Sequence, residues 1–577
     1  MVSQQSTWFQ RGRIEFVLYL ALACAAVWPL PKHLTTALPL GTEPVETVPL
    51  FNLWTLWWNA DRAAEGFHDY WQAPIFFPSA DAFAFSEPQP TSLVVAPLIW
   101  VMETPVAAYN VYLLLSLVLN GWSSFRLLRR LELDWAASFT GGAMVLLLPF
   151  VHWQLGVLQL VPLFGIVWTI HALVDLADGP NWRNGLRLGL SVAVTYFLCN
   201  HYGLFLCLLL VPTTPWLLGR RLCQWRTWGM IGFGAFICLA LIGPMVWTQM
   251  EVMHRHDWVR TRDLVETLSA RPSDLLVTPW RPQPPLPAEL VTPREWPWKL
   301  FPGLVKTVLA VVGVLGGLWN SRWRLPTLFL LGFGIVAELL ALGPFLKING
   351  WQPYWWLFEH VPGIAQVRSV YRFNVFAQLV LCFLAAIGVQ TLCIQIWRRS
   401  RDQADSQDRP SSKVGLVLTV GLAMLLGGWG AIELWPPKQK LHVMASPEVD
   451  RKWIEWLKDN SRSDAIVCGM PFVKGTRAED YAPETAWMLH GMLHRRRMTN
   501  GYSGFFPQTF RELKGSLSTF PSRLAFDSLA ELGVKWLIVD STKLPMTKLM
   551  SVPGIRNYLR LDFWDEDAGI AIYRLLK

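Results

Sequence analysis

Hydrophobic residues in this chain are gathered into long runs that alternate with shorter polar segments. Most runs approach the ~17–25 residues with which a helix crosses a bilayer, and a few are shorter. We predict spans at 14–30, 105–125, 136–150, 157–177, 186–200, 203–219, 228–247, 303–320, 326–342, 374–397 and 414–435. The pattern therefore predicts an α-helical polytopic membrane protein with about eleven transmembrane helices.

Basic clusters beside these runs indicate the orientation. They read RGR before the first run, RLLRR after the second, NWRNGLR after the fourth, GRRLCQWR after the sixth, SRWR after the eighth and RRSR after the tenth. All of them lie on one side of the membrane if residues 91–103 do not cross it. Because cytoplasmic loops are rich in Lys and Arg, the N-terminus is predicted in the cytoplasm and the C-terminus outside. A signal peptide is the alternative for the first run, since ALACAA is rich in small residues.

Four segments lie outside the membrane in this topology: 31–104, 248–302, 343–373 and the tail from about 436. The tail has a different pattern from the rest of the chain. EVDRKWIEWLKDN reads as an amphipathic helix, AIVCGMPF as a buried strand, SLAELGVKWLIVDS as a helix and a strand, and YLRLDFW with GIAIYRLL as a final strand pair. We predict a membrane domain over 1–435 and a small extracytoplasmic α/β domain over 436–577.

Composition agrees with a membrane protein. Hydrophobic residues make up 52% of the chain and charged residues 16%, against roughly 25% charged in soluble domains. The net charge of +9 could point to nucleic acid, but the basic residues form short clusters between apolar runs and no nucleic-acid motif is present. The eight cysteines form no CxxC, so a disulfide framework or a zinc site is not predicted.

The stretch FNLWTLWWNADR, 51–62, is too polar to span a membrane and too apolar for a solvent loop. On a helical wheel, Asn59 shares one polar face with Arg62, while Trp58 and Asp61 lie roughly on an aromatic face. The pattern predicts a helix lying flat on the outer leaflet, with its indoles at headgroup depth. A plain aromatic belt is the alternative. Asp61 becomes a candidate for proton transfer, because desolvation or a cationic neighbour tunes a carboxylate.

The rest of the first outer segment carries further acids, among them Glu43, Glu46 and Glu87. Ordered loops of this length in a membrane protein are usually functional. Trp58, Asn59 and Glu87 are therefore candidates for contacts with a substrate.

Basic residues of the other outer segments are candidates for anion binding. Arg368 and Arg372 are four positions apart where the tenth run begins, so we expect them to share a helical face and to bind phosphate. Snorkelling at the membrane surface is the alternative. His254 and Arg255, in HRHDWVRTRD, form a second candidate, although such a cluster is also typical of a solvated face. His152, at an outer helix end, is either a ligand or a structural histidine.

Several motifs carry a resemblance that covers most of the chain. They are VPLFNLWTLWWNADR, PIFFPSADAFAFSEPQP, AYNVYLLLSLVLNGWSSFRLLRRL, WKLFPGLVKTVLAVVG and EHVPGIAQVRSVYRF, with NGYSGFF and LGVKWLIVD in the tail. With the order of spans and loops, the chain resembles the GT-C superfamily of membrane glycosyltransferases, and more closely a set of bacterial membrane proteins near that superfamily. The resemblance implies transfer of a sugar from a polyprenyl-phosphate carrier, a membrane lipid, to an envelope acceptor at the outer face of the bacterial cytoplasmic membrane.

The resemblance also implies roles for residues. A first-loop carboxylate acts as general base on the acceptor hydroxyl, and basic residues, often with a divalent metal, hold the donor phosphate. The superfamily usually carries an Asp-Asp or Glu-Asp pair soon after the first span. Here that place reads GTEPVETVP, without an aspartate pair. The base is therefore open between Glu46, Glu43 and Asp61, and no metal ligand is assigned.

Two other functions remain as hypotheses. A transporter or flippase for a lipid-linked or polar cargo would place charged residues deep inside spans, where Glu338 is the clearest example, and it often shows inverted repeats, which this sequence lacks. A non-catalytic membrane protein with a tail that binds another envelope component would fit the α/β tail and the missing acid pair.

Overall fold

A computed structural model describes residues 2–102, 105–280, 298–405, 412–550 and 553–576. Parts of three predicted loops lie outside the described residues: 103–104, 281–297 and 406–411. The chain divides into two compact units. Unit 1 comprises Met1–Lys32, Leu113–Val246 and Val259–Gln439, and unit 2 comprises His33–Tyr112, Trp247–Trp258 and Lys440–Lys577.

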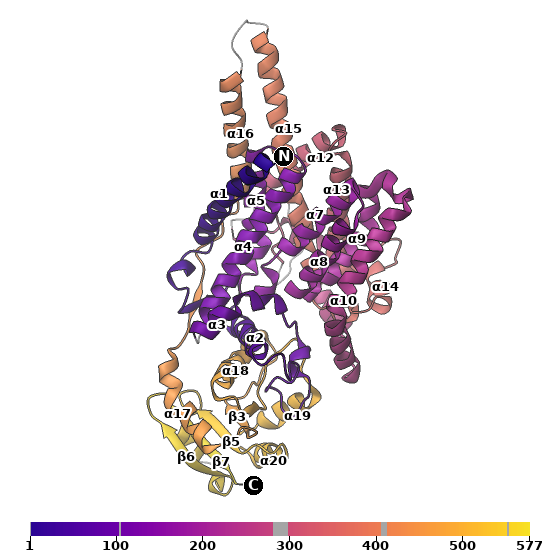
Figure 1. Ribbon diagram of the computed structural model, residues 1–577. Helices are drawn as coiled ribbons and strands as arrows, with labels where there is room; N and C mark the ends of the chain where they lie inside the picture. Colours follow the sequence, from indigo (N-terminus) through magenta and orange to yellow (C-terminus); the bar gives the residue numbers. More distant parts are fainter. Residues whose placement is uncertain (1, 103–104, 281–297, 406–411, 551–552, 577) are drawn as a thin grey trace. The chain divides into compact units, whose positions relative to one another are not determined.

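Unit 1 is a bundle of helices that run largely side by side (Figure 1). Its helices, some of which extend into unit 2, are α1 (Val2–Ala26), α4 (Pro105–Arg130), α5 (Trp135–Leu146), α6 (Pro149–Trp153), α7 (Phe164–Asp178), α8 (Trp182–Leu198), α9 (Asn200–Leu218), α10 (Trp225–Arg255), α11 (Arg262–Thr267), α12 (Leu304–Trp319), α13 (Arg324–Ala341), α14 (Pro353–His360), α15 (Asn374–Asp405) and α16 (Ser412–Ile432). A helix coincides with each predicted span.

The length and composition of these helices confirm a multi-pass membrane protein. Among the described residues, seven helices are long and apolar enough to cross a membrane, and three shorter apolar helices accompany them. Apolar side chains such as Phe236 and Leu239 of α10 are 66% and 65% exposed, as lipid-facing residues are. The total of about eleven crossings and the side on which each terminus lies stay predictions.

Glycines bring α12 and α15 into backbone contact. A Cβ on Gly313 would lie 1.9 Å from the carbonyl oxygen of Leu384, and a Cβ on Gly388 would lie 1.9 Å from that of Leu309. Membrane helices gain close packing in this way, because hydrophobic burial gives little driving force between helices in lipid. α15 also packs on α5, α13 and α16, so this contact joins α12 to the interior of unit 1.

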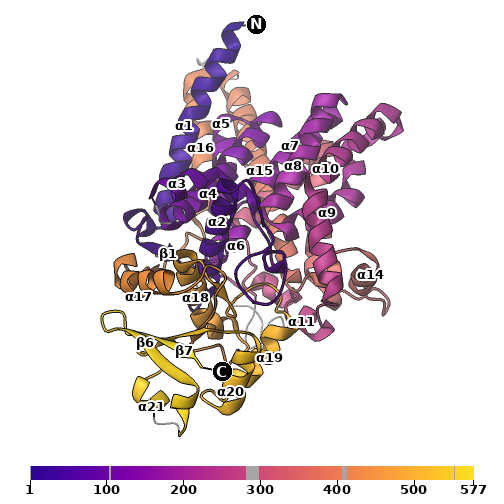
Figure 2. The same cartoon turned by 60° about the horizontal axis from the view of Figure 1, so that its bottom comes forward.

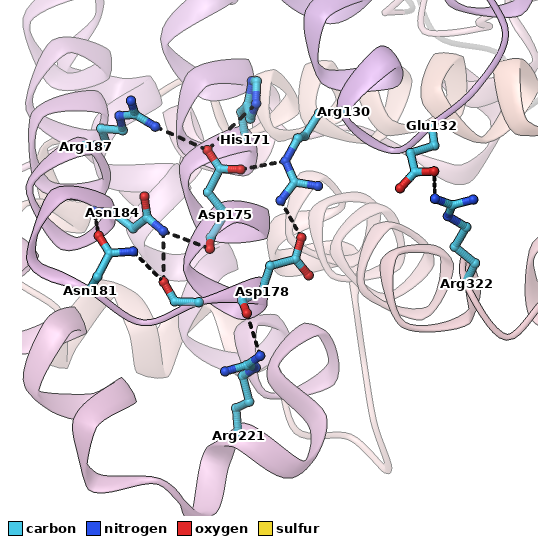
Figure 3. A network of polar contacts seen from close by, with 11 residues as sticks. Arg130, Glu132, His171, Asp175, Asp178, Asn181, Asn184, Arg187, Arg221 and Arg322 are labelled. Carbon is cyan, nitrogen blue, oxygen red and sulfur yellow. Dashed lines mark hydrogen bonds and ion pairs between the residues drawn. The ribbon is translucent and has the colours of Figure 1, made fainter. Parts of the chain in front are cut away.

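A polar network joins the ends of several unit 1 helices (Figure 3). Asp175 on α7 accepts a hydrogen bond from Arg130 Nε at 2.7 Å and lies 3.6 Å from Arg187 Nη1 on α8. Arg130 also pairs with Asp178, whose carbonyl accepts from Arg221. The network includes residues of three of the predicted cytoplasmic basic clusters, so these clusters lie at one end of the bundle.

Unit 2 contains a five-stranded sheet in the order β4-β3-β5-β7-β6. Figure 2 shows two of its strands, β6 and β7, side by side. Its strands are β3 (Ile466–Met470), β4 (Arg497–Met498), β5 (Trp536–Asp540), β6 (Leu559–Asp565) and β7 (Ile570–Leu575), and its tail helices are α17 (Pro447–Asn460), α18 (Ala482–His494), α19 (Gln508–Leu517), α20 (Arg523–Glu531) and α21 (Met546–Met550). β3 is parallel to β4 and β5, whereas β7 is antiparallel to β5 and β6. The α/β character of the tail is therefore confirmed.

The first outer segment folds together with the tail. It supplies β1 (Ala37–Pro39), α2 (Thr47–Ala64) and α3 (Ala96–Met102), and β1 pairs with β2 (Leu441–Val443). Residues 74–77 also cover the edge of β4, since Met498 N donates to Pro74 O at 3.0 Å and Phe77 N donates to Met498 O at 2.9 Å. An open strand edge is a site of aggregation, and here the first segment covers it. The domain boundary expected at 435/436 stays a prediction.

The prediction that α2 lies flat on the outer leaflet is wrong. Trp54 and Trp58 are 1% and 5% exposed and belong to the hydrophobic core of unit 2, where their rings stack at 5.9 Å between centroids. The opposite face is buried too, because Asn59 Nδ2 donates to Pro88 O at 2.6 Å and to Ser92 Oγ at 3.1 Å. The periodicity correctly separated two faces of the helix, but it could not tell whether each face meets lipid or protein.

Candidate functional site

Asp61 lies between two arginines near the end of α2. Arg62 Nε donates to its Oδ2 at 3.0 Å, and Arg495 Nη2, just after α18, donates to its Oδ1 at 2.6 Å. The Asp61 side chain is 7% exposed, and Arg495 also lies over the ring of Trp57. Both carboxylate oxygens already accept hydrogen bonds from cations, so a substrate proton could be taken only by breaking an ion pair. This geometry suits a structural ion pair better than a general base.

Glu46 stands immediately before α2 and is more accessible. Its carbonyl oxygen accepts the first helical hydrogen bond, from Leu50 N at 2.9 Å, so its backbone is fixed by the helix. Its side chain is 29% exposed, and its Oε2 lies 3.6 Å from Nδ1 of His442. Glu46 therefore combines a fixed backbone with a carboxylate that a solvent-borne hydroxyl could reach.

Glu43 lies in the turn between β1 and α2. Its backbone N donates to Leu40 O at 2.9 Å, and its side chain is half-buried near Tyr109. Asn110 holds the start of this segment, because its Nδ2 donates to Leu34 O at 2.9 Å and to Ala37 O at 2.8 Å. The two acids that follow the first predicted span thus belong to an ordered loop.

An arginine pair lies in unit 1, after α10 and before α15. Arg260 is tied to the chain around residue 366, since its backbone N donates to Ala365 O at 2.9 Å and its Nε to Gln366 O at 3.3 Å. Burial, together with the positive charge of exposed Arg368, lowers the pKa of Arg260 to about 9. An anion beside Arg260 and Arg368 would weaken the repulsion between their positive charges. In the sequence, Arg260 was one residue of a basic cluster, and only the tertiary structure shows its relation to Arg368.

The expectation that Arg368 and Arg372 share one helical face is wrong. α15 begins at Asn374, after both arginines. Arg372 belongs to a short 3-10 turn, Val370–Phe373, whereas Arg368 precedes that turn. The four-residue spacing puts side chains on one face only where the α-helix is continuous. Phosphate binding by these two residues stays a prediction.

Of the other candidates, Arg255, His254 and Glu87 belong to unit 2 and His152 to unit 1. Arg255 Nη1 lies 2.7 Å from Asp81 Oδ2, and its Nη2 pairs with Glu251 at 2.8 Å, so its charge is already matched by two acids. His254 beside it is exposed, and Glu87 is 8% exposed in the loop before α3. In unit 1, His152 is 3% exposed, and its Nε2 lies 3.0 Å from Leu146 O.

Sequence reasoning missed a buried cation in unit 1. Lys306, in the first turn of α12, is 0% exposed, and its Nζ has no hydrogen-bond partner among the described residues. Glu433 lies close by, and its carboxylate accepts from Leu304 N at 2.6 Å and from Val305 N. A charged residue inside a membrane bundle is costly and is therefore a functional candidate by default. The VK dipeptide at the start of an apolar run was the only signal in the sequence.

A metal site needs several ligand side chains close together. In neither unit do the described residues bring three His, Cys, Asp or Glu side chains close enough to share an ion. We assign no metal ligands, and the divalent metal stays an expectation of the resemblance.

No protein-family model matches the sequence, and no curated protein matches it either. Solved structures do match. The chain is similar to the arabinofuranosyltransferase AftD from Mycobacteria, with 12% identity and a TM-score of 0.57 over 98% of this chain and 40% of AftD. It is also similar to the archaeal oligosaccharyltransferase AglB from Archaeoglobus fulgidus, solved with an inhibitory peptide and a dolichol-phosphate, with 12% identity and a TM-score of 0.52 over 98% of this chain and 74% of AglB.

These similarities define the class of fold. The chain has the fold of the GT-C-type polytopic membrane glycosyltransferases, as its motifs predicted. It spans about 40% of the length of AftD, so parts of that protein have no counterpart here. At 12% identity the likeness concerns the fold and assigns no catalytic residue.

Proposed function

We propose that this protein is a membrane glycosyltransferase of the bacterial cytoplasmic membrane. It would transfer a sugar from a polyprenyl-phosphate carrier to an envelope acceptor at the outer face, with its N-terminus in the cytoplasm and its C-terminus outside. The likeness in fold to AftD and AglB carries the proposal, and the dolichol-phosphate bound to AglB supports a lipid-phosphate carrier.

In this proposal Glu46 is the general base. Its carboxylate takes the proton of the acceptor hydroxyl, and the freed oxygen attacks the anomeric carbon of the sugar. The bond from that carbon to the carrier phosphate breaks, and the phosphate leaves with the electron pair. Glu46 is favoured over Asp61 because it is accessible, whereas two arginines occupy the Asp61 carboxylate.

Arg260 and Arg368 are proposed to bind the donor phosphate. Bidentate hydrogen bonds from guanidinium groups match the geometry of a phosphate. The anchoring of Arg260 to residues 365 and 366 supports this role, because a fixed donor need not be reorganised during the reaction. Trp58 and Asn59, predicted to touch substrate, are buried, and we propose that they hold the first outer segment in place.

The test compares Glu46→Gln with Glu43→Gln and Asp61→Asn in membranes of expressing cells. The membranes receive a panel of radiolabelled polyprenyl-phosphate sugars, and lipid-extracted product is counted. We expect Glu46→Gln to lose roughly 100-fold or more of the product, as removal of a general base does. Full product from the triple variant would show that the enzymatic proposal is wrong.

Lys306 favours a second candidate, a transporter or flippase for a lipid-linked cargo. This function predicts that Lys306→Met stops the movement of a fluorescent polyprenyl-phosphate lipid across proteoliposomes, whereas Glu46→Gln leaves it unchanged. Wild-type protein that moves no lipid in this assay, while transferring sugar in the first one, would exclude the second candidate.

A further inference from the structure

His442 is brought to the first outer segment by a two-stranded sheet of unit 2. β1 and β2 pair antiparallel, and His442 stands opposite Leu38. The ladder continues beyond the strands, because Leu40 N donates to Lys440 O at 2.9 Å. The backbone of His442 is therefore held by its neighbours on both sides.

Glu46 reaches the same place from a different element. Its backbone is held at the start of α2, and Thr47 directly after it is 1% exposed. The side chains of Glu46 and His442 are 29% and 28% exposed, and Oε2 lies 3.6 Å from Nδ1. Two fixed backbones thus present a carboxylate and an imidazole to each other at the surface of the unit.

Other charged groups near the pair do not replace His442. Lys440, directly before β2, is exposed, and the Glu43 side chain lies near Tyr109. Among the residues that the structure describes, His442 is the one basic side chain recorded within 4.0 Å of the Glu46 carboxylate. Any restraint on that carboxylate from a basic side chain therefore comes from His442.

We infer that His442 is a positioning residue that holds the Glu46 carboxylate in the orientation in which it takes the acceptor proton. This inference rests on the proposed function. A free glutamate side chain samples many rotamers, and ordering it during the reaction costs entropy. An imidazole whose Nδ1 lies 3.6 Å from Oε2 restricts the rotamers of the side chain beforehand and leaves the second oxygen for the acceptor hydroxyl. The tail, which contributes His442, would thereby complete a site whose general base, Glu46, comes from the first outer segment.

A labelling experiment tests the pair without any substrate. The full chain in lipid nanodiscs is treated with a water-soluble carbodiimide and glycine ethyl ester, and labelling of Glu46 is followed by mass spectrometry. We expect His442→Ala to raise the labelling rate of Glu46 at least twofold, and His33→Gln, a change at an exposed histidine of the same unit, to leave it unchanged. An unchanged rate in His442→Ala would overturn the inference.

A kinetic experiment tests the role. With a donor that wild-type protein uses, His442→Ala should lower kcat by about 10- to 100-fold and leave the KM for donor unchanged, because misorientation of a base affects the transition state. His442→Gln keeps an N–H donor of similar size and should restore most of kcat. Equal turnover of wild type and His442→Ala would overturn the positioning role. Failure of the proposed function looks different, since wild type and Glu46→Gln would then be equally inactive while the labelling result still stands.

Discussion

Asp61 and Arg495 are 434 positions apart in the chain, and their side chains form an ion pair of 2.6 Å in unit 2. The pair connects the end of α2, in the first outer segment, to the end of α18, in the tail. Arg62, on the same helix as Asp61, forms a second ion pair with the same carboxylate. An acid that looked like a catalytic candidate is thus placed where it joins two segments of one folding unit.

We predict that Asp61→Asn destabilises unit 2 by about 1–3 kcal/mol, because it leaves two arginines beside a neutral group. The value is below that of a fully buried pair, since the Arg495 side chain is 55% exposed. Thermal unfolding of the full chain measures the effect, with Arg497→Gln as an exposed control on the neighbouring strand. A double-mutant cycle with Arg495→Gln should show coupling, and additive effects would contradict the ion pair.

The tail by itself should not be a stable domain. A fragment of residues 440–577 lacks α2, which packs on α18, and lacks residues 74–77, which cover the edge of β4. We expect this fragment to aggregate when expressed alone, and to copurify as a soluble complex when coexpressed with residues 33–102. A monomeric fragment with cooperative unfolding would show that the tail folds without the first outer segment.

The buried carboxyl group of Glu484 should make the stability of the folded protein depend on pH. It is fully buried in the first turn of α18 and accepts hydrogen bonds from Val473 N at 2.8 Å and Asn500 Nδ2 at 3.0 Å. Burial raises the pKa of Glu484 from 4.5 to about 7, against the lowering effect of these hydrogen bonds. The folded state therefore binds a proton more tightly than the unfolded state, and the stability that this proton provides is present below pH 4.5 and is lost as pH rises through about 7.

The measurement compares wild type with Glu484→Gln, because other groups also titrate. The free energy of unfolding of wild type, relative to that of Glu484→Gln, should fall by about 2–3 kcal/mol between pH 4.5 and pH 7.5. Glu479→Gln serves as the control, because Glu479 lies in the 3-10 turn directly before α18 and its side chain is 39% exposed. A difference that stays constant with pH would show that Glu484 does not titrate in this range.

If Arg260 and Arg368 bind the donor phosphate, replacing either of them should weaken donor binding. Replacing either by Gln removes a charged hydrogen-bond donor, so we expect the KM for the polyprenyl-phosphate donor to rise by about 10- to 100-fold, with a smaller effect on acceptor KM. Arg262→Gln is the matched control, because Arg262 forms an exposed ion pair with Glu359. An equal effect of all three changes would mean that the arginine pair has no specific role.

The close contact between α12 and α15 predicts that Gly388→Ala is destabilising. The added methyl group would lie 1.9 Å from Leu309 O, so the helices would have to separate. We expect a loss of about 1–3 kcal/mol and less folded protein in the membrane. Gly421→Ala on α16 is the control, since an added Cβ there meets nothing within 4 Å. Equal yields of the two variants, measured by size-exclusion chromatography, would contradict the packing.

The helices of unit 1 and the strands of the tail were predictable because each is set by a local pattern. An apolar run of sufficient length, as in 374–397, specifies a membrane helix by itself, and AIVCGMPF and GIAIYRLL specify buried strands in the same way. The GT-C-type fold followed from the order of these elements and from the motifs.

The site depended on which distant segments meet, and no local pattern contains that information. The sequence by itself determined that 51–62 is a two-faced helix, but only the tertiary structure decided that both faces meet protein. It likewise showed that Asp61 is held by Arg495, that Glu46 faces His442, and that Arg260 lies near Arg368. The physical reason is that side-chain periodicity records the polarity of a face, whereas its partner is selected by the packing of the whole unit.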